Sequence, residues 1–231
     1  MLTLAFDTSS KTIAVAILRD DVILYDAIIN VDLNHSEVLL SAIDYACRQI
    51  NIKIDKIDLF ASTIGPGSFT GLRIGVSTLK GLMLATEKPA VGISSLEALA
   101  LNVGKSSKII CSAMDAGRGQ VYAAFYRYNE KGFLDQIGTE KAVDPREIIH
   151  RPEQEIIFVG DGAIHYSGMI SHTETHKIKI ASTTQQYIRA SSVGILGREK
   201  YNRNDLLNAE TLVPVYLRSS DAREKKALFE N

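Results

Sequence analysis

The chain has 231 residues, of which 45% are hydrophobic, so it can bury a large core as one domain or two small ones. Its 26 basic residues balance 27 acidic ones, which argues against a protein that grips nucleic acid by itself, because neutralising phosphates needs a basic excess. The N-terminus has no basic leader, and no apolar run approaches about 18 residues. We therefore expect a cytoplasmic protein that does not enter a membrane.

The first half of the chain predicts three antiparallel strands, followed by helices and strands in alternation. The three strands are expected at residues 1–6, 13–18 and 22–29. Asn34 and Glu37 form a capping-box pattern, which predicts that a helix begins there and extends to about Ile50. The remaining elements are a strand over 57–64, a helix that reaches to about residue 85, a strand over 90–93 and a helix over 95–103.

Residues 65–75, here called the glycine block, connect a predicted strand with a predicted helix. A glycine-rich turn in this position exposes backbone N–H groups, where an anion or a partner surface can settle. The helix carries two interior glycines, Gly75 and Gly81, each of which costs about 1 kcal/mol relative to alanine. Such glycines indicate that another backbone comes close. The block is not a Walker loop, because no Lys and Ser/Thr pair follows its last glycine.

Apolar and small residues cover an unusually wide arc of this helix. Leu72, Val76, Leu79 and Met83 form one stripe, and a second stripe that includes Gly75 lies beside it. A helix that covers one face of its own sheet needs an arc of about 100°, and this one is about twice as wide. We therefore expect the helix to pack against a second body as well. The alternative is a helix wedged between neighbours of its own fold.

The second half of the chain repeats this order of elements. In each half the first strand ends in an aspartate, Asp7 or Asp115. A polar connector at 104–107 divides the chain into an N-terminal half, 1–105, and a C-terminal half, 106–231. The strands of the second half are expected at 108–114, 120–128, 133–137, 156–159 and 177–181, and its helices after Asp144, after Gly162 and over 184–199.

A duplicated unit of three antiparallel strands, helix, strand, helix, strand and helix is typical of the actin-like ATPase fold, which sugar kinases and Hsp70 proteins share. Two ribonuclease-H-like halves face each other there across a cleft, so the predicted class is α/β. In that fold the loops after the two first strands hold nucleotide phosphates. Asp7, Thr8, Ser9, Ser10 and Asp115 are therefore candidates for phosphate, ATP or ADP contact. The alternative is that both aspartates merely end strands and accept hydrogen bonds from turn amides.

Other residues that could carry catalysis or bind a metal have simpler explanations. His172 and His176 are four residues apart, but they stand among serine and threonine, where a solvated loop is favoured over a zinc site. Cys47 and Cys111 show no zinc spacing and are expected as buried thiols. No Ser, His and Asp set stands in a nucleophile-elbow context. We therefore expect no catalytic residue and no metal in this chain.

Short motifs across nearly the whole chain carry a resemblance to a known family. The motifs are Asp7 Thr8 Ser9, His35 Ser36 Glu37, the glycine block, Met114 Asp115 Ala116 with Val121 Tyr122, Gly160 Asp161 Gly162, and Pro214 Val215 Tyr216 Leu217 Arg218. In these the chain resembles the TsaB family, also called YeaZ, of bacterial proteins required for making threonylcarbamoyladenosine in tRNA. Gly117 Arg118 Gly119 depart from the family pattern, which more often has two basic residues followed by Gly or Asn.

The resemblance implies a non-catalytic subunit that binds the transferase TsaD in an assembly joined by the ATPase TsaE. Contact with tRNA is then expected only through the complex, and a homodimer is expected when TsaD is absent. The helix after the glycine block and the helix before it form the family's contact surface. The interface residues implied here are His35, Leu39, Ile43, Leu72, Gly75, Val76, Leu79 and Met83.

The resemblance also explains an absence. After the strand over 90–93 the catalytic relative TsaD carries a histidine pair that binds its metal, whereas this chain has serine and leucine in the segment Ser94 Ser95 Leu96 Glu97 Ala98 Leu99. Neither side chain replaces imidazole at a metal. Two alternatives stay open from the residues alone. One is a stand-alone ATPase or kinase of the same fold, and the other is a metallopeptidase that uses His172 and His176.

Overall fold

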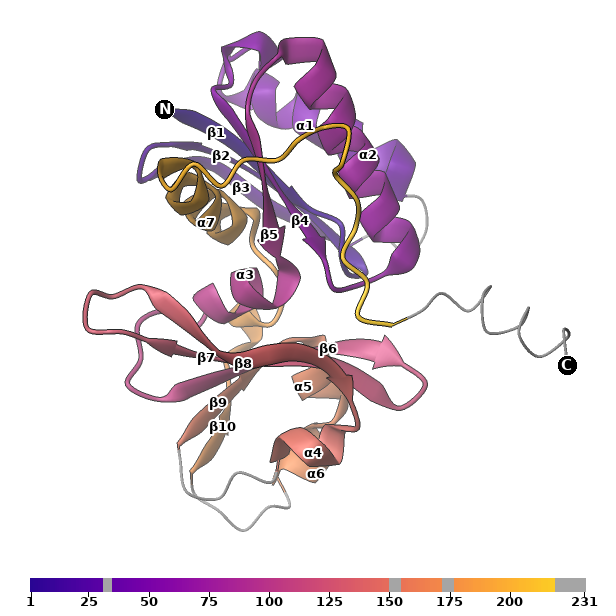
Figure 1. The fold of residues 1–231 in the computed structure, drawn as a ribbon, viewed down its shortest axis with the longest axis vertical. Coiled ribbons are helices and arrows are strands. Elements are labelled where there is room, and N and C mark those ends of the chain that lie inside the picture. The colour runs from indigo at the N-terminus through magenta and orange to yellow at the C-terminus, as the bar shows by residue number, and fades with distance from the viewer. Residues whose placement is uncertain (31–34, 150–154, 172–176, 219–231) are drawn as a thin grey trace, which may run out of the picture.

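The computed structural model describes residues 1–30, 35–149, 155–171 and 177–218. Figure 1 shows two sheets, one above the other, with helices against each. The first half contributes β1 (Leu2–Asp7), β2 (Thr12–Arg19), β3 (Val22–Asn30), α1 (His35–Gln49), η1 (Ile54–Lys56), β4 (Leu59–Gly65), α2 (Phe69–Thr86), β5 (Ala90–Ser94) and α3 (Ser95–Leu101). The second contributes β6 (Ile109–Gly117), β7 (Gln120–Tyr128), β8 (Leu134–Val143), α4 (Pro145–Ile149), β9 (Ile156–Val159), α5 (Asp161–His165), α6 (Ser167–Ser171), β10 (Ile178–Ile180), η2 (Thr183–Gln185) and α7 (Ala190–Asn202).

Both sheets have the same topology, which confirms the predicted duplication and the α/β class. In the first sheet β3, β2 and β1 pair antiparallel, and β4 and β5 extend the sheet parallel to β1. In the second sheet β8, β7 and β6 pair antiparallel, and β9 and β10 add parallel strands. The central strands β1 and β4 are mostly apolar and almost entirely buried, as expected for strands covered on both faces.

Helices cover both faces of the first sheet. α1 and α2 lie on its outer face, and α7 lies on the face turned toward the second sheet (Figure 1). Leu4 and Phe6 of β1 belong to the buried cluster under α1 and α2, whereas Ala5 between them belongs to the cluster under α7. Alternate side chains of a strand point to opposite faces, so one strand supplies both cores.

The last helix of each half packs between the two sheets. α3 contacts β6, β7 and β8 as well as β4 and β5, and α7 packs on β1, β2, β4 and β5 although it ends the second half. Gly194 and Gly197 make room for α7, because a Cβ at these positions would lie 2.5 Å from Leu18 Cδ1 and 2.6 Å from Ala61 Cβ. One buried cluster therefore contains residues of both sheets. The connector near residue 105 separates the two sheets in the sequence, whereas α3 and α7 each pack on strands of the other half.

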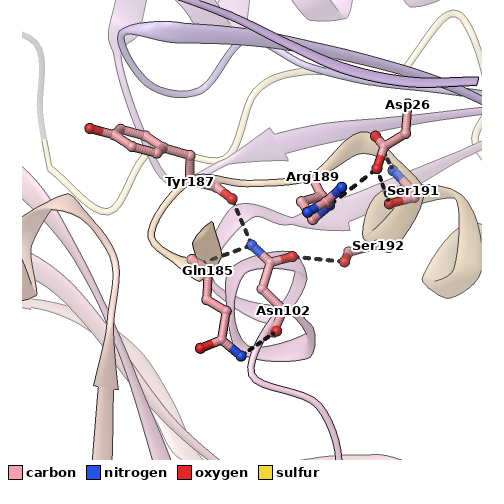
Figure 2. A network of polar contacts seen from close by, with 7 residues as sticks. All are labelled: Asp26, Asn102, Gln185, Tyr187, Arg189, Ser191 and Ser192. Atoms are coloured by element: carbon pink, nitrogen blue, oxygen red, sulfur yellow. Dashed lines mark hydrogen bonds and ion pairs between the residues drawn. The ribbon is translucent and has the colours of Figure 1, made fainter. Parts of the chain in front are cut away.

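Asn102, just after α3, ties together the connections between the halves (Figure 2). Its Nδ2 donates to the backbone carbonyl of Gln185 at 3.2 Å and to that of Tyr187 at 2.6 Å. Its Oδ1 accepts from Ser192 Oγ at 2.8 Å, and its backbone carbonyl accepts from Gln185 Nε2 at 3.1 Å. The segment that leads into α7 is thus fixed to the end of α3.

Several predicted element boundaries were wrong. The strand expected over 108–114, with Asp115 at its end, is β6, which continues through Asp115 to Gly117. The strand expected over 133–137 is β8, which continues to Val143. The helix expected over 184–199 is the turn η2 followed by α7, because Ser182 and Gln185 form a capping box that closes a single 3₁₀ turn first. None of the helices in the described part of the chain has both the length and the apolar character needed to cross a membrane.

Candidate functional site

A cleft of about 270 Å³ lies between the two halves. The loop after β1 and the start of α2 form one wall, and the end of β6 with the start of α5 forms the other. The lining residues are Ser9, Ser10, Lys11, His35, Ser68, Met114, Asp115, Gly117 and Asp161. The predicted candidates Ser9, Ser10 and Asp115 are therefore brought together, whereas Asp7 and Thr8 are not among the residues that line this cleft.

Asp7 is fully buried at the end of β1. Its Oδ1 accepts hydrogen bonds from the Ser9 backbone N–H at 3.0 Å, from Ser9 Oγ at 2.6 Å and from Thr63 Oγ1 of β4 at 2.5 Å. Its Oδ2 has no hydrogen-bond partner among the described residues. Burial raises the pKa of the Asp7 carboxyl, although these hydrogen bonds oppose the shift. The contacts favour the alternative of an aspartate that ends a strand and holds its turn.

The glycine block packs its backbone against the loop after β1. A Cβ at Gly67 would lie 2.2 Å from the Ser9 carbonyl oxygen, and a Cβ at Gly71 would lie 2.0 Å from that of Thr8. A Cβ at Gly75 would lie 2.4 Å from Thr8 Oγ1, which donates to the Gly71 carbonyl at 2.7 Å. Only glycine permits backbones to approach so closely. The glycines therefore seat α2 on the β1 loop. Of the two interior glycines for which a close approach was predicted, a Cβ at Gly75 would meet the Thr8 side chain, whereas one at Gly81 would meet no described atom outside the helix's own backbone within 4 Å.

The sequence left open that backbone N–H groups at the start of α2 bind an anion. In the structure, these N–H groups donate hydrogen bonds within the chain. The Ser68 N–H donates to the Ser9 carbonyl at 2.7 Å. Ser68 Oγ caps the helix by accepting from the Gly71 N–H at 3.3 Å, and the Leu72 N–H donates to the Ser68 carbonyl at 2.9 Å. These donors are oriented toward the chain itself. The block therefore acts in this structure as the turn that launches a helix.

The second wall of the cleft is acidic. Asp115 is exposed near the end of β6, and its Oδ1 accepts from the Gly117 N–H at 2.8 Å. The Asp115 N–H donates to Asp161 Oδ1 at 3.0 Å, and Asp115 Oδ2 lies 3.9 Å from His165 Nδ1. Burial raises the pKa of Asp161, and the charge of Asp115 adds to the shift, while backbone hydrogen bonds and Lys11 oppose it. Two carboxyl groups thus face the cleft from one side.

Asp161 was not among the predicted site residues. The topology supplies the missing signal, because β9 lies parallel beside β6, and residues that follow parallel strands meet at the same sheet edge. Asp115 follows the body of β6 and Asp161 follows β9, so the two carboxylates converge. The sequence showed each aspartate, but not that the strands before them are neighbours.

The cleft has walls of opposite charge. Lys11 lies on the first wall, and an anion bound beside it would also face Asp115 and Asp161. Carboxylate oxygens are ligands that Mg²⁺ accepts, so a phosphate here would need an accompanying cation. Within the described ranges, no three His, Cys, Asp or Glu side chains gather into a metal-binding group. His172 and His176 lie outside the described residues.

Most of the predicted interface residues lie in the core of the chain itself, so this part of the prediction is wrong. Their stripe faces the first sheet, and a side chain buried there is not available to another protein. The buried residues are Leu39, Ile43, Leu72, Gly75, Val76 and Leu79. His35 and Met83 are partly buried. Helical periodicity identified an apolar side, but it could not tell which side the sheet covers.

The opposite face of α2 is largely open, and its seven residues are uncharged, with the exposed Arg73 and the half-buried Lys80 along one border. We call it the outer face of α2, and it consists of Thr70, Ile74, Ser77, Thr78, Gly81, Leu84 and Ala85. Leu84 is 73% exposed. No described atom outside the helix's own backbone lies within 4 Å of the place that a Cβ at Gly81 would take. On the adjacent helix α1, Leu40 and Tyr45 are 57% and 55% exposed.

Similarity to known proteins extends over the whole chain. A family model described as "TsaD: tRNA N6-adenosine threonylcarbamoyltransferase" matches residues 30–226. The tRNA threonylcarbamoyladenosine biosynthesis protein TsaB of Bacillus subtilis is 32% identical over 228 residues, which cover 97% of both chains. The chain belongs to the TsaB family. TsaB of Escherichia coli is 31% identical over 169 residues, which cover 70% of this chain and 72% of that protein.

The fold of this TsaB family member is also found in a solved structure. YeaZ from Pseudomonas aeruginosa superposes with a TM-score of 0.79 at 23% identity, covering 94% of this chain and 99% of that one. At this level of identity the likeness shows the fold alone. Together with the duplicated topology, it confirms the predicted actin-like α/β fold.

The segment after β5 is structural in this TsaB family member. Ser94 Oγ caps α3 by accepting from the backbone N–H groups of Leu96, at 3.2 Å, and Glu97, at 3.3 Å. The same hydroxyl donates to Glu140 Oε1 of β8, which links the two halves. Leu96 and Leu99 lie in the buried cluster that both sheets share. These residues are therefore occupied in capping and packing.

Proposed function

We propose that the chain is a non-catalytic subunit in the synthesis of threonylcarbamoyladenosine in tRNA. It binds a TsaD-type transferase and supports transfer of threonylcarbamoyl from its adenylate to the adenosine beside the anticodon. The observation that carries this proposal is the similarity, over 97% of the chain, to a protein named for that biosynthesis. Balanced charge gives the chain no general affinity for phosphates, so tRNA reaches it only through the complex. Because the substrate of the assembly is tRNA, we also propose a cytoplasmic location.

The outer face of α2 is the surface that we assign to the transferase. Interface cores are depleted in charged residues, and the seven residues of this face are uncharged, with Arg73 and Lys80 only at its border. Gly81 costs the helix about 1 kcal/mol relative to alanine, and no described contact within the chain makes use of its missing side chain. A partner backbone that approaches closely would explain this glycine. Leu84, the most exposed large side chain of the face, would fill a pocket on the partner.

A charged residue in the outer face of α2 tests this docking. Leu84→Glu places a carboxylate in the proposed interface without touching the core, because the side chain is 73% exposed. We expect its affinity for the purified transferase to fall at least about tenfold, or 1.4 kcal/mol. Met169→Glu on α6, where the side chain is 43% exposed, is the matched control. Equal affinities of both variants and the parent chain would refute the assignment.

The homodimer follows from the same surface. In the absence of the transferase, two copies of the chain would pair through their outer faces of α2, because burying exposed apolar side chains such as Leu84 is favourable. Sedimentation of the isolated chain should then show a dimer that Leu84→Glu converts to a monomer. If the Leu84→Glu variant sediments like the parent chain, the outer face of α2 does not form the dimer contact.

The non-catalytic role is supported by the residues after β5, where Ser94 caps a helix and Leu96 is buried. We expect the isolated chain to leave tRNA unmodified when it is supplied with threonylcarbamoyl-adenylate, and to modify it only when the transferase is added. Metal analysis separates this proposal from the metallopeptidase alternative. A stoichiometric ion that is lost with His172→Ala or His176→Ala would contradict the non-catalytic role.

Nucleotide contact is proposed for the complex rather than for the chain alone. The cleft of about 270 Å³ is smaller than the usual range of ligand pockets, roughly 300–1,000 Å³. Asp115 and Asp161 also repel an unaccompanied phosphate. We expect titration with ATP or ADP to give weak binding alone, and tighter binding once TsaD and TsaE are present. ATP turnover by the isolated chain that Asp115→Asn abolishes would instead favour a stand-alone ATPase.

A further inference from the structure

Residues 207–218, here called the C-terminal strap, return from α7 across the first half. The strap passes beside α2 and ends near β6, on the side of the molecule away from α7 (Figure 1). Its Leu207 N–H donates to the Ala90 carbonyl at 2.9 Å, and its Val215 N–H donates to the Ile64 carbonyl at 2.7 Å. Leu212 is 3% exposed in the cluster under α1 and α2. The strap is thus built into the first half.

The glycine block is shaped to receive the strap. Gly65 has φ +136°, and a Cβ there would lie 2.2 Å from the Val215 carbonyl oxygen. Tyr216 packs on Phe69, the first residue of α2, with ring centroids 4.8 Å apart. The Arg73 guanidinium covers the same Phe69 ring at 3.9 Å. The start of α2 and the strap therefore form one packed unit.

The end of the strap reaches the second half. Arg218 Nη1 donates to the Ala116 carbonyl at 3.0 Å, and lies 3.5 Å from both the Gly117 carbonyl and Gln120 Oε1. These acceptors lie in the last two residues of β6 and the first residue of β7, and the end of β6 also carries Asp115 into the cleft. A guanidinium that donates to backbone carbonyls makes a charge-assisted bond with fixed geometry. The strap thus joins the first wall of the cleft to the second.

A separate tie lies at the connections between the halves. There, Asp26 of β3 accepts from Arg189 Nε at 3.1 Å and from Ser191 Oγ at 2.7 Å, beside the Asn102 contacts (Figure 2). Two covalent connections and these bonds restrain that side of the molecule. Where β6 ends and β7 begins, Arg218 of the strap supplies a restraint of its own. Motion of the halves about their connections would therefore lengthen or shorten the hydrogen bonds that Arg218 donates to the second half.

We propose that the C-terminal strap is an intramolecular tie that fixes the spacing between the two walls of the cleft, with Arg218 as its attachment to the second half. The strap is anchored at the start of α2, so the position of this helix and the position of the β6 end that carries Asp115 are coupled. The tie does not rest on the proposed function, because it follows from contacts within the chain.

The tie can be tested by measuring the distance between the halves in the full chain. Spin labels at Thr70→Cys, at the start of α2, and Glu147→Cys, on α4, report this distance by double electron–electron resonance, since both positions are exposed. The native Cys47 and Cys111 are buried and stay unlabelled. The parent chain should give one narrow distance distribution. Arg218→Ala should broaden it without a loss of helix signal in circular dichroism.

Two further variants make the measurement decisive. Arg48→Ala removes an exposed arginine of α1 and should keep the narrow distribution. Arg218→Lys keeps the charge but loses the planar fork, and it should broaden the distribution less than Arg218→Ala. If Arg218→Ala does not fold, the comparison is made on Arg218→Lys. A distribution as narrow as that of the parent chain in the folded Arg218 variants would overturn the proposal.

Discussion

Two glycines of α2, Gly75 and Gly81, differ in what a side chain would meet. At Gly75 a Cβ would lie 2.4 Å from Thr8 Oγ1, so the residue is needed by the fold of the chain itself. At Gly81 a Cβ would have no described atom outside the helix's own backbone within 4 Å. A charged substitution at Gly75 would therefore disrupt the fold of the chain, so it could not serve as a test of partner binding. Gly81 is the glycine that points to a contact outside the chain.

Alanine substitutions at these glycines should act in opposite directions. Gly75→Ala should lower the free energy of unfolding by about 1–3 kcal/mol, because the added methyl group overpacks the contact with Thr8. Gly81→Ala should raise it by up to about 1 kcal/mol through helix propensity. Urea unfolding of the isolated chain measures both values. Shifts of the same sign would contradict the packing described for α2.

Glu97 of α3 should make stability depend on pH. Burial raises the pKa of its carboxyl above 4.5, with Glu140 and Glu199 adding to the shift and Lys200 and Arg203 opposing it. Its contribution to stability is fully present below the unfolded-state pKa and is lost as the pH rises through the folded-state pKa. Glu97→Gln removes this loss. The variant should therefore gain stability relative to the parent as pH rises from 4.5 toward neutrality in urea unfolding, and parallel curves would contradict it.

At the scale of elements, α2 shows what sequence patterns can and cannot establish. Its start, its glycines and its wide apolar arc followed from the sequence. The side that meets the sheet did not, because periodicity gives relative and not absolute orientation. Leu72, Val76 and Leu79 were therefore assigned to a partner, although they lie in the core. Asp161 was missed for a related reason, since strand adjacency is decided by tertiary pairing.

Asn102 makes the contacts between elements whose loss should lower the stability of the chain most directly. Asn102→Ala removes its bonds to the Gln185 and Tyr187 carbonyls and leaves Ser192 Oγ without this acceptor. We expect the free energy of unfolding to fall by about 1–3 kcal/mol. Gln49→Ala, at the exposed end of α1, should change it by no more than about 0.5 kcal/mol. Equal effects of the two substitutions would show that the Asn102 contacts do not fasten the connections.

At the scale of the whole molecule, the duplication of the sheet was predictable from the sequence. The packing of α7 from the second half on the sheet of the first half, which interlocks the halves, was not. Asp7 and Asp115 were each predicted to end a first strand, and this pattern predicted two equivalent sheets. Nothing in the apolar pattern of α7 indicated that it covers the sheet of the other half. Gly194 and Gly197, spaced three residues apart, are the residues that permit it, yet helix glycines alone do not name the neighbour. Tertiary packing decided this placement.

Interlocking predicts that the halves do not fold separately. In a fragment of residues 1–105 the inner face of the first sheet would lose Ala190, Val193 and Leu196 of α7, which belong to its buried cluster. We expect this fragment to lack a cooperative urea transition, whereas the full chain unfolds in one step. A cooperative transition of the fragment would contradict the shared core.

The most direct test of the proposed function is tRNA modification in a reconstituted mixture. It contains TsaD, TsaE, threonylcarbamoyl-adenylate and tRNA, and it is run without the chain, with the chain, with Leu84→Glu and with Met169→Glu. We predict modification with the parent chain and with Met169→Glu, and little with Leu84→Glu or without the chain. Equal modification in all four mixtures would contradict a subunit that acts through the outer face of α2.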